Sequence, residues 1–260
     1  MDEILGYLLD DLRTLKACSL TCRCLFGAVR PLIHQRLVCL GSTSEWHRQV
    51  KRSLLSRRKR DPGAFEQLIG ADRLGVLRYT RSLTLKSKHV YHSLRFSPGN
   101  MREYLPHLRS ISKLQSLTLE TFYLSPFIPV FHEYFGSFTN TLQRLDIRDT
   151  GCAVPELLYI ICQFPLLEDL AIVFPAIALT AHPEHQVPTI TRSPPLRGKL
   201  AIARVHSREL SEGLAALPGG LNFRSLELTL CGRLETVFNA CSHTVTSVSY
   251  LWRWGDIGCG

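Results

Sequence analysis

The sequence predicts an α/β protein in which a short helical module precedes stacked repeats that share a parallel sheet of about seven short strands. Three observations lead to this prediction. An apolar pattern recurs in order along the chain after about residue 80. Segments with helical spacing or many prolines separate its copies. The first forty or so residues carry a different pattern, in which apolar positions recur at helical intervals.

The recurring pattern is Leu-x-x-Leu-x-Leu, most clearly over residues 114–119, 142–147 and 167–172. The central positions of all copies, in chain order, are Leu83, Leu117, Leu145, Leu170, Leu200, Leu226 and Val248. Their intervals of about 22 to 34 residues fit an irregular leucine-rich-repeat solenoid, in which neighbouring units bury each other's apolar strand positions. The alternative is an ordinary mixed domain whose leucine-rich composition repeats by chance, but the ordered copies favour the repeat.

The segments between the copies contain helix and loop signals. We expect a helix over residues 208–217 after an N-cap at Ser207, and another over 153–162 with Pro155 in its first turn. Residues 174–195 contain five prolines, which is incompatible with a long helix and predicts a loop. The repeat units therefore combine a strand with a helix or with a looser return segment.

The amino-terminal residues predict three short helices. Leucines over residues 5–9 share one helical face, Asp11 can cap a second helix, and Thr21 can cap a third. We expect Pro31 to end that third helix near Arg30 and to begin a further short turn. A unit of about 40 residues buries too little surface to be stable alone. It must therefore bind a partner or, alternatively, cap the first strand of the repeats.

The start of the chain, Asp-Glu-Ile-Leu over residues 2–5 followed by Leu-Lys-Ala-Cys-Ser-Leu-Thr-Cys-Arg over 15–23, resembles an F-box. Residues 164–170 and 194–200 are similar to sequence segments in the repeats of fungal F-box/leucine-rich-repeat proteins. The resemblance implies an F-box over 1–42, a basic linker over 43–62 and a leucine-rich-repeat domain over 63–260. One departure is Met1, which stands where F-boxes commonly carry the proline of a Leu-Pro pair.

The resemblance implies a non-catalytic substrate receptor of a Skp/cullin/F-box ubiquitin ligase, which binds a Skp-family adaptor, through it a cullin, and an unknown target protein. Carried over by position, the residues expected to contact the adaptor are Ile4, Leu5, Leu8, Leu9, Leu15, Leu20 and Leu25. A repeat scaffold that works without any ligase is the alternative. A hydrolase-type enzyme is the third hypothesis, and would need a positioned cysteine nucleophile.

Residues that alternate with the buried strand positions form the surface that a target protein would meet. The middle of this surface carries charges of both signs, so we expect a polar partner that is bound through ion pairs and hydrogen bonds. The predicted substrate-binding residues are Lys86, Glu120, Arg144, Asp146, Arg148 and Asp169. The alternative is a solvated face without a partner.

No catalytic, metal or cofactor site is predicted. The chain lacks a Gly-x-Ser-x-Gly elbow, a phosphate-binding glycine loop and a His-Glu-x-x-His helix. His182, Glu184 and His185 lie together, but in the proline-rich loop, where no rigid element would fix metal geometry. Cys18 and Cys22 are one helical turn apart and fit an apolar face better than a zinc site.

The positive charge is local. Much of the formal net charge of +9 comes from Lys51, Arg52 and the run over residues 57–60. This segment has the shape of a bipartite nuclear import signal or, equally, of a solvated linker. It has no interleaved aromatic residue, so we do not expect nucleic-acid binding. The longest apolar run, 157–162, is too short to span a membrane, and we expect a cytoplasmic protein that the import signal would also bring to the nucleus.

Overall fold

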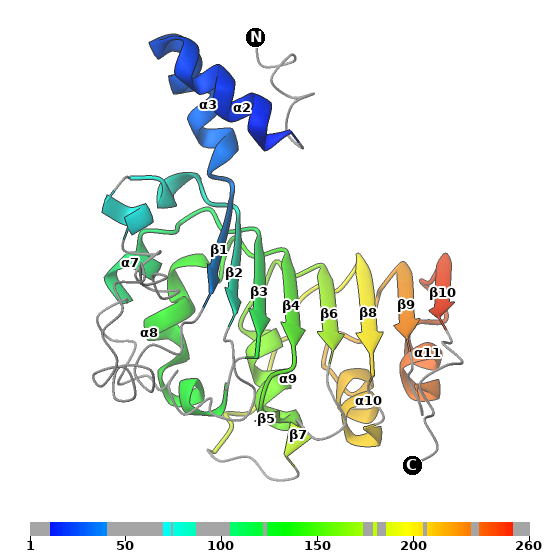
Figure 1. Cartoon of the computed structure of the whole chain (residues 1–260). Helices are drawn as coiled ribbons and strands as arrows, with labels where there is room; N and C mark the ends of the chain where they lie inside the picture. The colour runs from blue at the N-terminus through cyan, green and yellow to red at the C-terminus, as the bar shows by residue number, and fades with distance from the viewer. Residues whose placement is uncertain are drawn as a thin grey trace, which may run out of the picture.

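The computed structural model describes residues 11–40, 70–73, 75–86, 105–121, 124–173, 179–180, 186–204, 207–229 and 234–251. The protein is α/β, with eight strands in one parallel sheet whose spatial order follows the chain (Figure 1). These strands are β1 (Arg36–Leu40), β2 (Ser82–Lys86), β3 (Ser116–Glu120), β4 (Arg144–Arg148), β6 (Asp169–Val173), β8 (Lys199–Ala203), β9 (Ser225–Thr229) and β10 (Ser247–Leu251).

The seven predicted strands are confirmed, and their register is the one that the repeat pattern predicts. Leu83 pairs with Leu117, Leu117 with Leu145, and each later central position with the next one, as far as Leu226 with Val248. The eighth strand, β1, was not predicted. It lies within residues 1–42, which the sequence assigned to the helical module, and it pairs with β2 at one edge of the sheet.

Backbone hydrogen bonds fix each strand against the one before it. The two N–H groups that open β3, those of Gln115 and Ser116, both donate to the carbonyl of Arg81, at 2.7 and 2.9 Å. In the same way, the N–H groups of Gln143 and Arg144 both donate to the carbonyl of Gln115, at 2.9 Å each. This repeated arrangement aligns the strand starts, so the sheet register does not depend on side chains alone.

Threonine side chains add a second link between neighbouring units. The Thr141 hydroxyl donates to the carbonyl of Leu114 at 2.7 Å, and the Thr244 hydroxyl donates to that of Phe223 at 3.0 Å. Each threonine stands three residues before its strand, and each acceptor stands two residues before the preceding strand. These bonds satisfy carbonyls that would otherwise lie unpaired beside the core.

Three strands are followed by a non-glycine residue in the left-handed region: Thr121 after β3, Asp149 after β4 and Arg204 after β8, with φ of 55°, 49° and 60°. Such a conformation costs about 1–2 kcal/mol for a residue with a side chain. The cost is offset because each N–H donates to the last residue of the neighbouring strand, as Thr121 does to Arg148 at 2.8 Å. The chain thus leaves the sheet in a similar way at three places.

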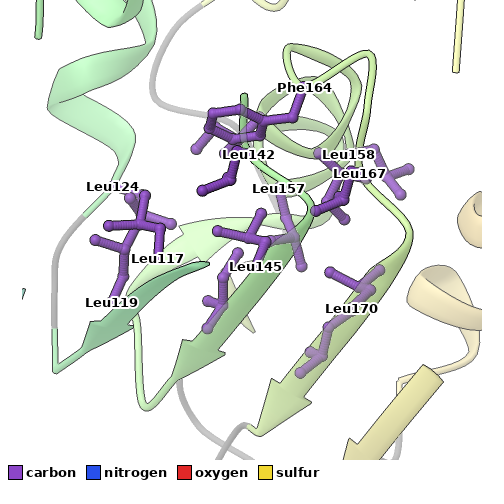
Figure 2. Close-up of a cluster of buried hydrophobic side chains, with 14 of the residues drawn as sticks. Leu117, Leu119, Leu124, Leu142, Leu145, Leu157, Leu158, Phe164, Leu167 and Leu170 are labelled. Atoms are coloured by element: carbon purple, nitrogen blue, oxygen red, sulfur yellow. The ribbon is translucent and has the colours of Figure 1, made fainter. Parts of the chain in front are cut away.

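Helices lie along one side of the sheet (Figure 1). The α-helices are α7 (Leu105–Arg109), α8 (Phe131–Phe135), α9 (Val154–Cys162), α10 (Arg208–Ala215) and α11 (Glu235–Cys241), and the 3-10 helices are η1 (Leu77–Tyr79), η4 (Ser125–Val130) and η5 (Gly136–Phe138). The inward side chains of the strands meet these helices in one continuous core. Figure 2 shows Leu117, Leu145 and Leu170, from three neighbouring strands, on the side of the sheet where Leu157 of α9 lies.

The expected helices over 153–162 and 208–217 are confirmed as α9 and α10, with ends within two residues of the prediction. Ser207 caps α10 by accepting a hydrogen bond from the Leu210 N–H at 3.2 Å. At the start of α9 the side chain comes from inside the helix: the Glu156 carboxylate accepts a hydrogen bond from the N–H of the N-cap residue, Ala153, at 2.9 Å. Within the predicted loop over 174–195, the short strand β7 (Leu179–Thr180) pairs with β5 (Cys152–Ala153).

Two helices of the amino-terminal module are described: α2 (Leu12–Thr21) and α3 (Arg23–Ile33). The predicted first helix, over residues 5–9, lies outside the described residues. Asp11 caps α2 as expected, accepting from the Thr14 N–H at 3.0 Å. The cap predicted at Thr21 is wrong, because the Cys22 sulfur takes this role for α3.

The expected break at Pro31 is also wrong, since α3 continues through it to Ile33. Pro31 has no N–H to donate to the Gly27 carbonyl, so the last turn of the helix lacks one backbone hydrogen bond. The N–H group of His34, three residues later, still donates to the carbonyl of Arg30, at 3.3 Å. The last turn therefore closes although it includes the proline.

At the far edge of the sheet, the core side of β10 is uncovered. Val248 and Tyr250 are in register with the buried Leu226 and Leu228, yet both are about half exposed. A cavity of about 420 Å³ lies beside Tyr250, against Phe238 of α11. The described part of the chain contains no helix long and apolar enough to cross a membrane.

We predict that Leu145→Ala lowers the free energy of unfolding by about 2–5 kcal/mol, because Leu145 is fully buried at the centre of the core. Thr118→Ala, on the other side of the adjacent strand, should change it by less than about 1 kcal/mol. Urea unfolding followed by circular dichroism measures both. Equal losses for the two variants would contradict the assignment of the two faces.

Candidate functional site

The face of the sheet turned away from the core, here called the outer face, is built from alternate strand residues. In β4 the side chains of Leu145 and Ile147 are buried, whereas Arg144 and Arg148 are exposed. The neighbouring strands repeat this alternation. Because the strands are in register, outer-face residues from different repeats form continuous rows across the sheet.

Two ion pairs occupy the middle of the outer face. Arg144 on β4 binds Asp169 on β6, with its Nε at 3.0 Å and its Nη2 at 2.7 Å from Oδ2. Arg148 binds Asp146 of its own strand, with its Nε at 2.9 Å from Oδ1 and its Nη2 at 2.5 Å from Oδ2. Both guanidinium groups are thus held in fixed orientations by carboxylates on the sheet.

Two further ion pairs flank this middle region. Lys86 on β2 pairs with Glu120 on β3, directly opposite in the register. Lys199 on β8 pairs with Glu227 on β9. The outer face therefore carries paired charges along most of its width, from β2 to β9.

A groove of about 410 Å³ opens between the β4 pairs and the Lys199–Glu227 pair. Three alanines line it: Ala171 on β6, and Ala201 and Ala203 on β8. Since alanine is much shorter than the arginine and lysine side chains on either side, these positions leave a hollow with an apolar floor. Figure 1 shows the strands that carry it, β4, β6, β8 and β9, side by side from the middle of the sheet toward β10.

At its β4–β6 end, the groove presents its cations to solvent and keeps its carboxylates near the sheet. The Arg144 side chain is 62% exposed and its partner Asp169 26%, while Arg148 is 49% exposed and Asp146 13%. The hydrogen bond to Asp146 raises the pKa of Arg148, so this residue stays charged. The open side of the groove is therefore rich in hydrogen-bond donors.

Asp169 is anchored from two directions. Its Oδ1 accepts a hydrogen bond from the Lys199 backbone N–H at 2.7 Å, while its Oδ2 binds Arg144. The preceding residue, Gly198, makes this approach possible, because a Cβ there would lie 2.0 Å from Oδ1. A glycine at this position is thus needed for the ion pair to form as it does.

The six predicted substrate-binding residues all lie on the outer face, and the structure divides them into two groups. Arg144, Asp146, Arg148 and Asp169 line the groove, whereas Lys86 and Glu120 form a separate pair on β2 and β3. Lys199, Glu227 and the alanines of the groove were not among the predicted substrate-binding residues. Alternation places them on this face, but only the register shows that they share one groove with Arg144.

The helical module has an apolar surface of its own. Leu20, at the end of α2, is 87% exposed, and Phe26 in α3 is 48% exposed. Arg30 lies over the Phe26 ring, with its Cζ 5.6 Å from the centroid. Leu20 was among the predicted adaptor contacts, whereas Phe26 was missed, although it follows the predicted contact Leu25 directly.

The other predicted adaptor contacts differ in position. Leu15 is fully buried and packs with Val29, so it joins α2 to α3. Leu25 is partly buried. Ile4, Leu5, Leu8 and Leu9 lie outside the described residues, as does the basic run over 51–60. The structure therefore leaves Leu20 and Phe26 as exposed large apolar side chains of α2 and α3.

The described cysteines within the repeat region show no activated thiol. Burial raises the pKa of Cys152, and the nearby Glu156 charge raises it further. Burial also raises the pKa of Cys162 to about 11, and that of Cys241. A nucleophilic cysteine needs the opposite shift, toward thiolate. In the described part of the chain no group of three metal-ligating side chains is found, and His182, Glu184 and His185 lie outside that part.

In comparisons with known proteins, no family model, curated protein or solved structure matches this chain. Two surfaces of the protein are the candidates for binding partners: the groove on the outer face, and the exposed apolar residues of the helical module.

We predict that the protein loses stability as the pH rises from about 9 to 11. The raised pKa values mean that Cys152 and Cys162 keep their protons in the folded state, while the unfolded chain loses them above its ordinary thiol pKa of 9.0. Each such group lowers the free energy of unfolding by up to about 1.4 kcal/mol per pH unit in this range. Urea unfolding at pH 8, 9.5 and 10.5 measures the slope.

The control is Cys152→Ala, which removes the most buried of these thiols. The free energy of unfolding of this variant should fall less steeply with pH than that of the wild type. Lysines and tyrosines contribute to the slope in both proteins. An identical slope in both proteins would show that the Cys152 thiol does not contribute.

Proposed function

We propose that this protein is a substrate receptor of a Skp/cullin/F-box ubiquitin ligase, with residues 1–42 as the F-box and the repeats as the target-binding domain. The helical module binds a Skp-family adaptor and through it a cullin, and the groove on the outer face binds the target protein. The protein performs no chemistry itself. It accelerates ubiquitin transfer by raising the effective concentration of the target near the conjugating enzyme.

The observation that carries this proposal is the exposed apolar surface of the helical module. The α2–α3 pair has its own small core around Leu15 and Val29, separate from the core of the sheet. Leu20 and Phe26 are large apolar side chains outside that small core. Leaving them in water gives up the free energy of their burial, about 1.5–3 kcal/mol for each side chain. A protein partner that covers them recovers this free energy.

The position of the helices supports a role in presenting a target. Only His34 and Gln35 separate the end of α3 from β1, and the Arg81 and Ser82 N–H groups both donate to the Gln35 carbonyl, at 2.9 Å each. A short, hydrogen-bonded connection limits how far the helices can move relative to the sheet. An adaptor on the helices would therefore hold the sheet, and any target on it, at a defined distance.

The sheet supports the leucine-rich-repeat part of the proposal. Its strands follow one another in chain order, all pairs are parallel, and helices cover one side. A leucine-rich-repeat solenoid has this arrangement of strand, return segment and next strand. Its free strand face is the usual place for a protein ligand, and here that face carries the groove.

A ligase-independent repeat scaffold is the second candidate. The groove favours it as much as the first, because a charged outer face can bind a protein whether or not an adaptor is present. The exposed apolar surface of α2 and α3 separates the two candidates. It has a function in the receptor and none in the scaffold.

We predict that Leu20→Asp reduces copurification of the Skp adaptor and the cullin from cells at least tenfold, because a carboxylate would be buried in the adaptor interface without a partner. Leu166→Asp is the matched control. Leu166 is an exposed leucine in the repeat region, and its substitution should leave copurification unchanged.

Circular dichroism of both variants checks the fold. Since Leu20 is exposed, Leu20→Asp should unfold at the same temperature as the wild type within a few degrees. No adaptor with the wild type would refute the receptor and favour the scaffold. Undiminished adaptor binding by the folded Leu20→Asp variant would show that Leu20 is not part of the adaptor interface.

A further inference from the structure

We infer that the groove on the outer face binds an extended target segment through an anionic side chain, a carboxylate or a phosphorylated residue, that lies next to a small aliphatic residue. This inference rests on the proposed function, because it specifies the chemistry of the target at the same site. It is carried by the orientation of the ion pairs and by the alanine floor.

The two arginines are already oriented to receive an anion. Asp169 and Asp146 bind them through Nε and Nη2, and within the described residues no bond involves the Nη1 of either guanidinium. The Nη1 groups therefore remain for a ligand. Because the carboxylates hold Arg144 and Arg148 in place, little side-chain entropy is lost when the ligand binds.

The two carboxylates beside the arginines, Asp146 and Asp169, are poor sites for a cationic ligand, whereas Glu227, at the other end of the groove, is 45% exposed. Asp146 is almost covered, and both its oxygens accept from Arg148. Asp169 accepts from Arg144 and from the Lys199 N–H. A lysine or arginine from a target would have to displace these bonds, whereas an anion adds to them. At the β4–β6 end of the groove, the exposed cations thus favour a negative group.

The floor of the groove defines the neighbouring residue of the ligand. Ala171, Ala201 and Ala203 leave room for an aliphatic side chain, and burying one there adds hydrophobic free energy. Beyond the floor, the Lys199–Glu227 pair closes the groove. A large aromatic or charged residue has no matching group at the centre of this surface.

The width of the groove fits a short extended segment. It reaches from β4 to β9, three strand spacings of about 4.8 Å each, or roughly 14 Å. About four residues of extended chain cover this distance. One of them would place its anionic group at Arg144 or at Arg148, and a following residue would fill the hollow over the alanines.

The test uses the full-length chain and pools of immobilised eight-residue peptides. One central position is fixed as Glu, phosphoserine, Gln or Ser, the residue that follows it is Val, and all other positions are random. We expect the wild type to retain the Glu or phosphoserine pool at least about tenfold better than the Gln and Ser pools, as a charge-assisted bidentate contact predicts. If only the phosphoserine pool is retained, the target is phosphorylated. If the Glu pool is retained as well, a carboxylate is sufficient for binding.

Three variants locate the binding. Arg144→Gln combined with Arg148→Gln should abolish the preference for anionic pools, and Ala201→Leu should weaken all binding because it fills the hollow. Lys86→Gln is the matched control, since Lys86 is an ion-paired cation of the outer face that does not line the groove. It should retain the full preference. Thermal unfolding confirms that each variant is folded.

Equal retention of neutral and anionic pools by the wild type would overturn the inference. So would an anionic preference that survives in the folded Arg144→Gln, Arg148→Gln variant. Neither result depends on the Skp adaptor, whose copurification is measured separately. The two proposals are therefore tested separately. The peptide pools can refute the anion site while adaptor copurification supports the receptor, and the opposite combination of results can also be recognised.

Discussion

The burial of one row of leucines, in register across parallel strands, holds this structure together. Leu83, Leu117, Leu145, Leu170 and Leu200 occupy equivalent positions on neighbouring strands, and all are almost completely buried. No single repeat can shelter its own leucine, because the covering side chains come from the units on either side and from the helices behind. The backbone and threonine bonds between strand starts then fix the register that this row requires.

The same register determines which side chains lie next to each other on the outer face. Arg144 and Asp169 are 25 residues apart in the chain, and they meet because β4 and β6 pair without a shift. A shift of one strand by one residue would turn its member of the pair toward the core. Gly198 and the alanines of β6 and β8 complete the groove only while all these strands stay aligned. The candidate binding site is thus a consequence of the apolar face on the opposite side of the sheet.

Seven of the strands could be predicted from the sequence. Apolar residues alternate within each strand and the pattern recurs in order along the chain, and few folds are compatible with both features. The sequence did not predict β1, whose Arg-Leu-Val-Cys-Leu sequence continues from a helix without a pattern of its own. It also could not separate Leu15 from Leu20. Helical spacing shows that residues share a face, but not which of them a neighbouring helix covers. The groove needed the register, which joins residues far apart in the chain.

Amide hydrogen exchange on the intact chain tests the central claim most directly. If the leucine row and the in-register strands hold the fold, amides of β3, β4 and β6, which are hydrogen-bonded between neighbours and lie beside the core, exchange most slowly. Those of β10, whose side chains are all exposed, exchange fastest among the strands. Protection in β4 that is equal to or lower than that in β10 would contradict this account.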